Sequence, residues 1–270
     1  MKLKYTLIFF VTLFVLTGCS KDEKLEEDVT TPPSQQEQSE EEIKNLPYTF
    51  PLTGIKTAEE PTSRPIAITI NNHPDARPQS GISKADIVYE MLVEGDATRY
   101  LAIFQSNIPE KIGPVRSARD YFIEIAKGLD SLYIAHGYSP EAHQMLNSGV
   151  VDHINGMQYD GIYFNRSTNR KAPHNSYITA ENIALATQKL NISLENEKNV
   201  AYTFYADEDS VKMGNKANKI YMNYFSQNSS YSSIYSYDAE SKKYFKSSPQ
   251  ANTMDELVDE QVAISNVLFF

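Results

Sequence analysis

The sequence contains a single cysteine and no tryptophan among its 270 residues. One cysteine cannot form a disulfide within the chain, so a folded domain must be stabilised by its own hydrophobic core. Positive charge is also scarce, because 25 lysines and arginines face 35 aspartates and glutamates, giving a formal net charge of −10. An acidic chain has no electrostatic attraction for a phosphate backbone, so we expect no nucleic-acid partner.

Several motifs of known chemistry are absent from the sequence as well. It has no glycine-rich phosphate loop, no dinucleotide-binding fingerprint, no G-x-S-x-G motif and no S-x-x-K motif. None of the 5 histidines is followed four residues later by another, and the only cysteine is Cys19. The spacing therefore predicts no metal site and no cofactor.

Residues 1–19 have the pattern of an export signal. Lys2 and Lys4 precede an apolar run that ends at Leu16 and is too short to cross a bilayer comfortably. The stretch closes on L-T-G-C, which resembles the lipobox of bacterial lipoprotein signals. In that family the cysteine is lipidated and becomes the first mature residue. We therefore expect a lipid anchor on Cys19, which places the chain on the outer face of the cytoplasmic membrane. The alternative is a plain signal peptide or membrane anchor with a chance cysteine.

The composition changes twice after this signal. Residues 20–47 are rich in Glu, Gln, Ser and Pro, so they are predicted to form a disordered acidic tether. Residues 48–193 alternate between strand and helix patterns, and residues 194–270 are dense in tyrosine and strand patterns. The fold class that we expect is α+β: a mixed sheet with packed helices, followed by a smaller β-rich C-terminal domain. Because the sequence ends on the apolar stretch NVLFF, we expect this second domain to be incomplete.

Local signals place some elements within the first domain. The β-rich runs DIVYEMLVEG and TRYLAIFQS are separated by a short polar loop and predict a hairpin, with Glu94 opposite Arg99 as a cross-strand pair. Ser139, followed by Pro140, predicts a helix N-terminus, and Thr179 predicts another.

All seven arginines lie between residues 64 and 170. Arginine is preferred to lysine where a planar fork must bind a carboxylate or phosphate. In the stretch GPVRSARD, Ser117 resembles an N-cap, which would place Arg116 and Arg119 beside free backbone N–H groups. This arrangement predicts an anion site, to which Arg77 could contribute. The alternative is that Asp86, Glu90 or Glu124 neutralises the two arginines within the fold.

Two histidines complete the candidate site. His136 ends a predicted strand, and His174 lies in the loop KAPHNSY, where Pro173 stiffens the chain and Asn175 tolerates a turn. Such histidines can act as general acids or bases, but each is as well explained as a structural hydrogen-bonding group. His73, His143 and His153 are weaker candidates.

Several longer motifs carry a resemblance to a known family. The stretches INNHPDARPQSGISKADIVYEMLVEG, IGPVRSARDYF, HGYSPEA and APHNSY together resemble the YerB-like lipoproteins of Gram-positive bacteria, a family defined by a domain of unknown function. The resemblance implies a mixed α/β architecture and an envelope lipoprotein, and it implies no reaction. The motif residues that it carries over, none with an assigned role, are Asn72, Arg77, Gln79, Glu90, Glu94, Arg99, Arg116, Ser117, Arg119, His136, Pro173, His174 and Asn175.

Three functional hypotheses follow. The first is a membrane-anchored binding module that recognises an anionic envelope ligand or an envelope protein through Arg77, Arg116, Arg119 and Asn175. The second is an envelope hydrolase or transferase that uses His174 or His136 as acid–base, with Glu90 or Glu94 as its partner. The third is an interaction scaffold without a small ligand. Because the sequence contains no recognisable nucleophile or metal motif, we favour the binding module.

Overall fold

The computed structural model describes residue 43 and residues 45–198, 200–205, 214–225 and 228–270. Cys19, the predicted signal and nearly all of the predicted tether lie outside these ranges. Within the described ranges, no helix has the length and apolar character needed to cross a membrane.

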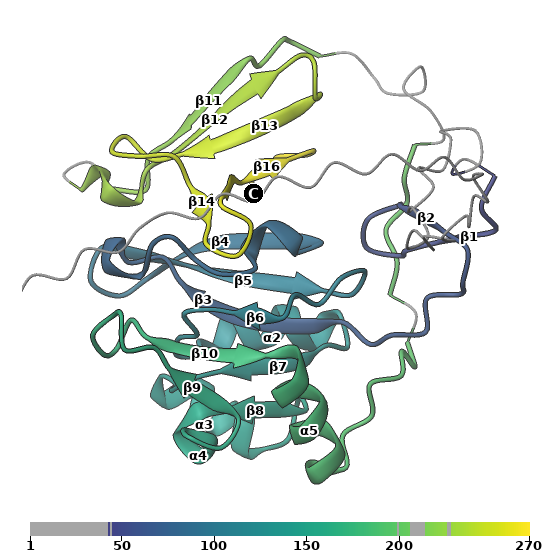
Figure 1. Cartoon of the computed structure of the whole chain (residues 1–270), viewed down its shortest axis with the longest axis vertical. Helices are drawn as coiled ribbons and strands as arrows, with labels where there is room; N and C mark the ends of the chain where they lie inside the picture. Colours follow the sequence, from purple (N-terminus) through teal and green to yellow (C-terminus); the bar gives the residue numbers. More distant parts are fainter. Residues whose placement is uncertain (1–42, 44, 199, 206–213, 226–227) are drawn as a thin grey trace, which may run out of the picture. The chain divides into compact units, whose positions relative to one another are not determined.

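A five-stranded mixed sheet forms the centre of the fold (Figure 1). Its order is β4-β5-β3-β7-β8. Strand β5 pairs antiparallel with β4 and with β3, whereas β7 pairs parallel with β3 and with β8. The predicted hairpin is confirmed as β4 and β5, joined by a three-residue turn. The bounds are Ile66–Asn71 for β3, Ile87–Val93 for β4, Ala97–Phe104 for β5, Leu132–Ala135 for β7 and His153–Asn155 for β8.

Successive strand residues point to opposite faces of this sheet, and other elements cover both faces. On one face Ile66, Ile68 and Ile70 of β3 pack with Ile183 of α5 (Ala180–Leu190). On the other face Leu101 and Ile103 of β5 pack with α2 and α3. These two helices span Asp120–Gly128 and Pro140–Asn147, and a short helix α4 spans Gly156–Tyr159.

Of the three predicted helix N-termini, two are confirmed and one is wrong. Ser139 and Thr179 are N-caps of α3 and α5, as predicted, and their side chains accept backbone N–H groups. The prediction for Ser117 is wrong, because α2 begins at Asp120 and Arg119 occupies the N-cap position without a side-chain hydrogen bond. Ala118 instead forms a parallel bridge with Tyr138, which keeps this segment extended past the predicted start.

Smaller sheets flank the central one. Strands β6 (Lys111–Ile112), β10 (Ser176–Thr179) and β9 (Phe164–Arg166) form a three-stranded sheet in that order. Near the start, β1 (Tyr48–Thr49) pairs with β2 (Lys56–Thr57). Three short 3-10 helices are also described: η1 (Pro74–Ala76), η2 (Ile82–Lys84) and η4 (Ser229–Tyr231).

The C-terminal part is a four-stranded sheet beside β4 and β5 (Figure 1). Its order is β11-β12-β13-β16, and β14 pairs separately with β15. A mixed sheet with packed helices and a β-rich C-terminal part is the predicted α+β class, which is confirmed. The bounds are Lys219–Met222 for β11, Ser233–Asp238 for β12, Lys243–Ser247 for β13, Met254–Asp255 for β14, Glu260–Gln261 for β15 and Ala263–Ile264 for β16.

Buried polar contacts join this C-terminal sheet to the rest of the fold. Lys246 of β13 forms an ion pair with Glu90 of β4 at 2.9 Å, and both side chains are only 7% exposed. The buried carboxylate of Asp255 accepts the backbone N–H groups of Gly81 and Ser83 at 2.9 and 2.8 Å. The domain boundary at residue 193 stays a prediction, and a chain ending there would leave Glu90 without its cation.

Candidate functional site: an arginine and histidine cavity

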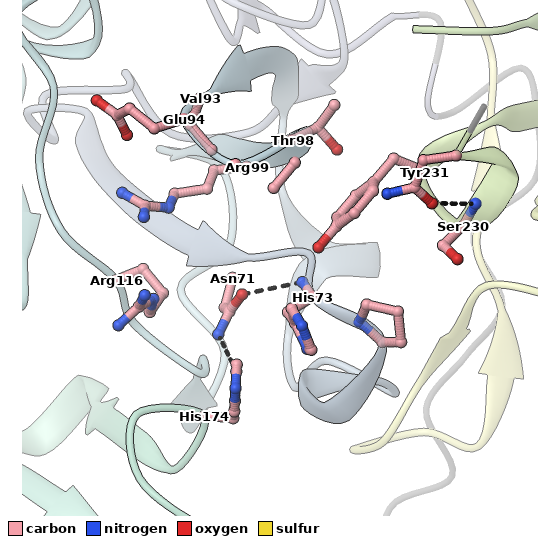
Figure 2. A pocket seen from close by; sticks show the side chains of 14 residues that line it. Asn71, His73, Val93, Glu94, Thr98, Arg99, Arg116, His174, Ser230 and Tyr231 are labelled. Carbon is pink, nitrogen blue, oxygen red and sulfur yellow. Dashed lines mark hydrogen bonds between the residues drawn. The ribbon is translucent and has the colours of Figure 1, made fainter. Parts of the chain in front are cut away.

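A cavity of about 350 Å³ lies where β3 ends and the β4–β5 hairpin turns. Its walls come from five segments far apart in the sequence, including the 3-10 helix η4 in the C-terminal part (Figure 2). The side chains that matter for its chemistry are Asn71, His73, Arg99, Arg116, His174 and Tyr231.

Arg116 is the central cation of this cavity. Its backbone is fixed on both sides, because its N–H donates to Thr69 O and its carbonyl accepts the N–H of His136, each at 2.9 Å. The side-chain Nε is buried and has no hydrogen-bond partner. Among the described residues, no carboxylate forms an ion pair with its guanidinium. Burial lowers the pKa of Arg116, and the positive charges of Arg119 and Arg166 lower it further.

Arg99 contributes a second guanidinium to the same cavity. It is buried, and one of its N–H groups donates to Ser117 O at 2.8 Å. Burial lowers its pKa to about 10, with smaller contributions from Arg119 and Arg116. The predicted cross-strand pair with Glu94 is wrong, because the register places Arg99 opposite Met91. The site therefore contains more positive charge than its own carboxylates neutralise.

His73 and His174 form a stacked pair at the edge of the cavity, with ring centroids 4.4 Å apart. Figure 2 shows Asn71 joined to both residues. Its Oδ1 accepts the His73 N–H at 2.9 Å, so its Nδ2 must donate to His174 Nδ1 at 2.9 Å. His73 Nδ1 accepts the N–H of Asp75 at 3.2 Å. Each neutral ring therefore carries its proton on Nε2, and both Nε2–H groups are donors.

The same histidines belong to a group that could hold a metal ion. His73, Asp75 and His174 each offer one ligand atom, and these atoms lie within 4.8 Å of one another. A metal requires an unprotonated ring nitrogen, but the hydrogen bonds above occupy both Nδ1 atoms and leave Nε2 protonated. Burial, His73 and Arg116 lower the pKa of His174, in that order, which favours its neutral ring. The nearby positive charge of Arg116 opposes a bound cation and favours an anion.

Arg119 and Arg77, two of the predicted anion ligands, are engaged within the fold. Arg119 Nε donates to both carboxylate oxygens of Glu94 at 2.8 and 2.9 Å, and Nη2 forms an ion pair with the same group. This hydrogen bond holds the pKa of Glu94 below its usual value. Arg77 donates to the carbonyls of Asn72 and Ser230 at 2.9 and 2.8 Å. Of the three predicted arginines, only Arg116 has no side-chain hydrogen bond or ion pair to another described residue, which leaves it available for a ligand.

A second cavity of about 230 Å³ contains His136 and again Arg116. Arg166 donates to His136 Nε2 at 3.0 Å, so the ring donates from Nδ1 to Ser176 Oγ at 2.7 Å. Arg166 itself pairs with Asp160 and donates to Asn175 Oδ1 at 3.1 Å. Burial lowers the pKa of His136, and Arg166 is the next contributor. His136 and Asn175 therefore both position Arg166, and their side-chain hydrogen-bonding groups are already used within the protein.

The family follows from comparison with known proteins. A family model described as "Protein of unknown function (DUF3048) N-terminal domain" matches residues 52–193. The chain belongs to this DUF3048 family. A curated relative named "Putative lipoprotein YerB", from Bacillus subtilis (strain 168), is 43% identical over 218 residues, which cover 80% of this chain and 65% of the relative. The chain thus spans slightly less than two thirds of that relative's length.

A solved structure supports the same assignment. The crystal structure of the YerB protein from Bacillus subtilis matches with a TM-score of 0.71 at 42% sequence identity. The match covers 80% of this chain and 71% of that chain. The DUF3048 fold described above is therefore shared with an experimentally determined relative.

The two carboxylates proposed for acid–base chemistry in this DUF3048 chain are both engaged. Glu94 binds Arg119, whereas Glu90 binds Lys246 and also accepts from Asn72, Thr98 and Ser233. In the described part of the chain, neither glutamate is hydrogen-bonded to His136 or His174.

Sequence reasoning missed Asn71 of the DUF3048 cavity, ranked His73 among the weaker candidates and gave Arg99 a different role. Asn71 is the last residue of the buried strand β3 and His73 lies two residues beyond it, so polar residues at the end of a buried strand were the available signal. Arg99 was attributed to a pair with Glu94 that the hairpin register does not form. The contributions of Asn228, Ser230 and Tyr231 had no signal, because only the packing of the C-terminal sheet brings them to the cavity.

Proposed function

We propose that this chain is a lipid-anchored extracytoplasmic binding module that holds an anionic ligand of the cell envelope on Arg116. The observation that carries the proposal is the buried, unpartnered Nε of Arg116 in a cavity with a second guanidinium. A buried polar group without a partner is costly, so such a group in a cavity is best explained by a ligand that completes it.

The donors around Arg116 define the chemistry of the ligand. A guanidinium fork matches the geometry of carboxylate and phosphate oxygens. Arg99 adds positive charge, and the Nε2–H groups of His73 and His174 add two donors at the edge. These donors and positive charges favour a carboxylate or phosphate group as the ligand's head.

The location rests on the signal and on the relative. The stretch that ends at Cys19 resembles a lipobox, and the Bacillus subtilis relative carries a lipoprotein name. A lipid anchor on Cys19 would keep the binding module on the outer face of the cytoplasmic membrane. The enzyme hypothesis has less support, because Glu90 and Glu94 are committed to Lys246 and Arg119. No observation favours the ligand-free scaffold.

Arg116→Gln tests the anion site in residues 20–270, a form that keeps every described residue. Sulfate or phosphate should raise the melting temperature of the wild-type protein, because at a hundredfold excess over Kd a ligand adds about 2.7 kcal/mol to the free energy of unfolding. Arg116→Gln should lose this shift while retaining its unliganded stability, since it removes an unpaired buried cation.

Lys84→Gln is the matched control, because Lys84 is an exposed cation that does not line the cavity. It should keep the wild-type response. An equal loss in both variants would mean that the anions act through overall charge, and an undiminished shift in Arg116→Gln would refute the site.

Cys19→Ala tests the anchor in the full chain expressed in bacteria. Without the cysteine, no acyl chain can be attached at this position, so the processed protein should move from the membrane fraction to the soluble fraction. The measurement is fractionation followed by immunoblotting, with the uncleaved precursor resolved by its mass. Processed protein that stays with the membrane would contradict lipidation at Cys19.

A further inference from the structure

The two cavities have neighbouring linings. Arg116 lines both of them, so they meet at this residue. Two consecutive loop residues also contribute to both cavities, because Pro173 lines the second cavity and His174 lines the first. A ligand lying across Arg116 would therefore reach both cavities.

The second cavity offers few free hydrogen-bonding groups. Its polar residues Ser117, His136 and Arg166 are all bonded within the protein: Ser117 Oγ donates to His136 O at 3.2 Å, and the imidazole is bonded at both nitrogens. Arg166 is held by Asp160 and Asn175. The remaining walls are Val115, Gly137, Met157 and Pro173. Apart from Arg116, this cavity presents surfaces suited to an apolar group.

The first cavity has the opposite character and a larger volume. Its 350 Å³ fall within the range of small-molecule pockets, roughly 300–1,000 Å³, whereas 230 Å³ is below that range. The first cavity is also lined by Arg116, whose buried Nε has no partner, and by His73 and His174 with their Nε2–H donors. The volumes and the hydrogen-bonding groups of the two cavities thus suit a ligand with a charged head in the first cavity and a small substituent in the second.

We propose that the ligand is an organic anion whose phosphate or carboxylate head binds Arg116 in the first cavity and whose short aliphatic substituent occupies the second. This inference rests on the proposed anion-binding function. It adds that an inorganic anion fills only half of the site. A substituent against Val115, Met157 and Pro173 gains affinity by removing apolar surface from water.

The test uses a series of n-alkylphosphonates, from methyl to butyl, with residues 20–270. Isothermal titration should show binding of methylphosphonate and a gain of about fourfold in affinity for each added methylene until the cavity is full. Met157→Trp should abolish the gain with chain length, because Met157 is 61% exposed at this cavity and the indole would fill it. The affinity for methylphosphonate should stay near that of the wild type.

Ile162→Trp is the matched control, since Ile162 is 62% exposed and lines neither cavity. It should keep the full chain-length dependence. Methylphosphonate binding with no gain along the series would overturn this inference and leave the proposed function standing. Loss of the gain in both tryptophan variants, or in neither, would place the substituent elsewhere and also overturn it. No binding of any phosphonate would count against both proposals.

Discussion

Glu90→Gln should lower the free energy of unfolding by about 3–5 kcal/mol, because it leaves the buried ammonium of Lys246 without its counter-charge. Both side chains are 7% exposed, and Glu90 Oε2 lies 2.9 Å from Lys246 Nζ. Although burial opposes the charge on Lys246, Glu90 together with Tyr100 and Tyr235 outweighs it and raises the pKa of the lysine. The protein therefore holds a charged lysine that depends on this one carboxylate.

The loss should be visible as a lower midpoint in urea denaturation, followed by circular dichroism. Glu124→Gln is the control, because the one ion pair of Glu124 with a described residue is an exposed one with Lys127, their side chains being 59% and 50% exposed. Such surface changes alter stability by no more than about 0.5 kcal/mol. The double variant Glu90→Gln with Lys246→Met should recover part of the loss, since it removes the unpaired charge. A loss no larger than that of Glu124→Gln would show that the pair does not hold the C-terminal sheet in place.

Gly156→Ala should destabilise the protein by about 1–3 kcal/mol, as is usual when a methyl group is forced into a packed site. A Cβ at Gly156 would lie 2.2 Å from Nδ1 and 2.3 Å from Cγ of the His136 ring. The ring cannot easily move, because Ser176 and Arg166 hold its two nitrogens and Phe164 packs against it. Displacing it should also disturb the second cavity, which it lines.

Thermal unfolding of three further variants makes this prediction specific: Gly128→Ala, His136→Ala, and Gly156→Ala combined with His136→Ala. Gly128→Ala should be neutral or slightly stabilising, because Gly128 ends α2 and its added Cβ meets nothing within 4 Å. Gly156→Ala in a His136→Ala background should cost little, since the clashing ring is gone, so a double-mutant cycle should show strong coupling. If Gly156→Ala is as harmless as Gly128→Ala, His136 is not fixed by this contact.

Much of the local structure could be predicted from the sequence because its causes are local. Ser139 and Thr179 cap helices through backbone N–H groups three residues away, and the β4–β5 hairpin follows from two β-rich runs around a short turn. Ser117 has the same local signal and fails, because a bridge between Ala118 and Tyr138 overrides it. Local preference decides an element only where no distant contact competes.

The partners of the charged residues were decided by the tertiary structure alone. The sequence by itself showed that arginines gather between residues 64 and 170, and it singled out Arg116, Arg119, His136 and His174. It could not show that Glu94 would neutralise Arg119, nor that Glu90 would meet Lys246 across 156 positions of the chain. Ion pairs depend on distances of a few ångströms, and these are set by how sheets and loops pack. Arg116 is a candidate binding residue for the same reason: packing carries it beside His174 and Arg99 and brings no carboxylate of the described chain to it.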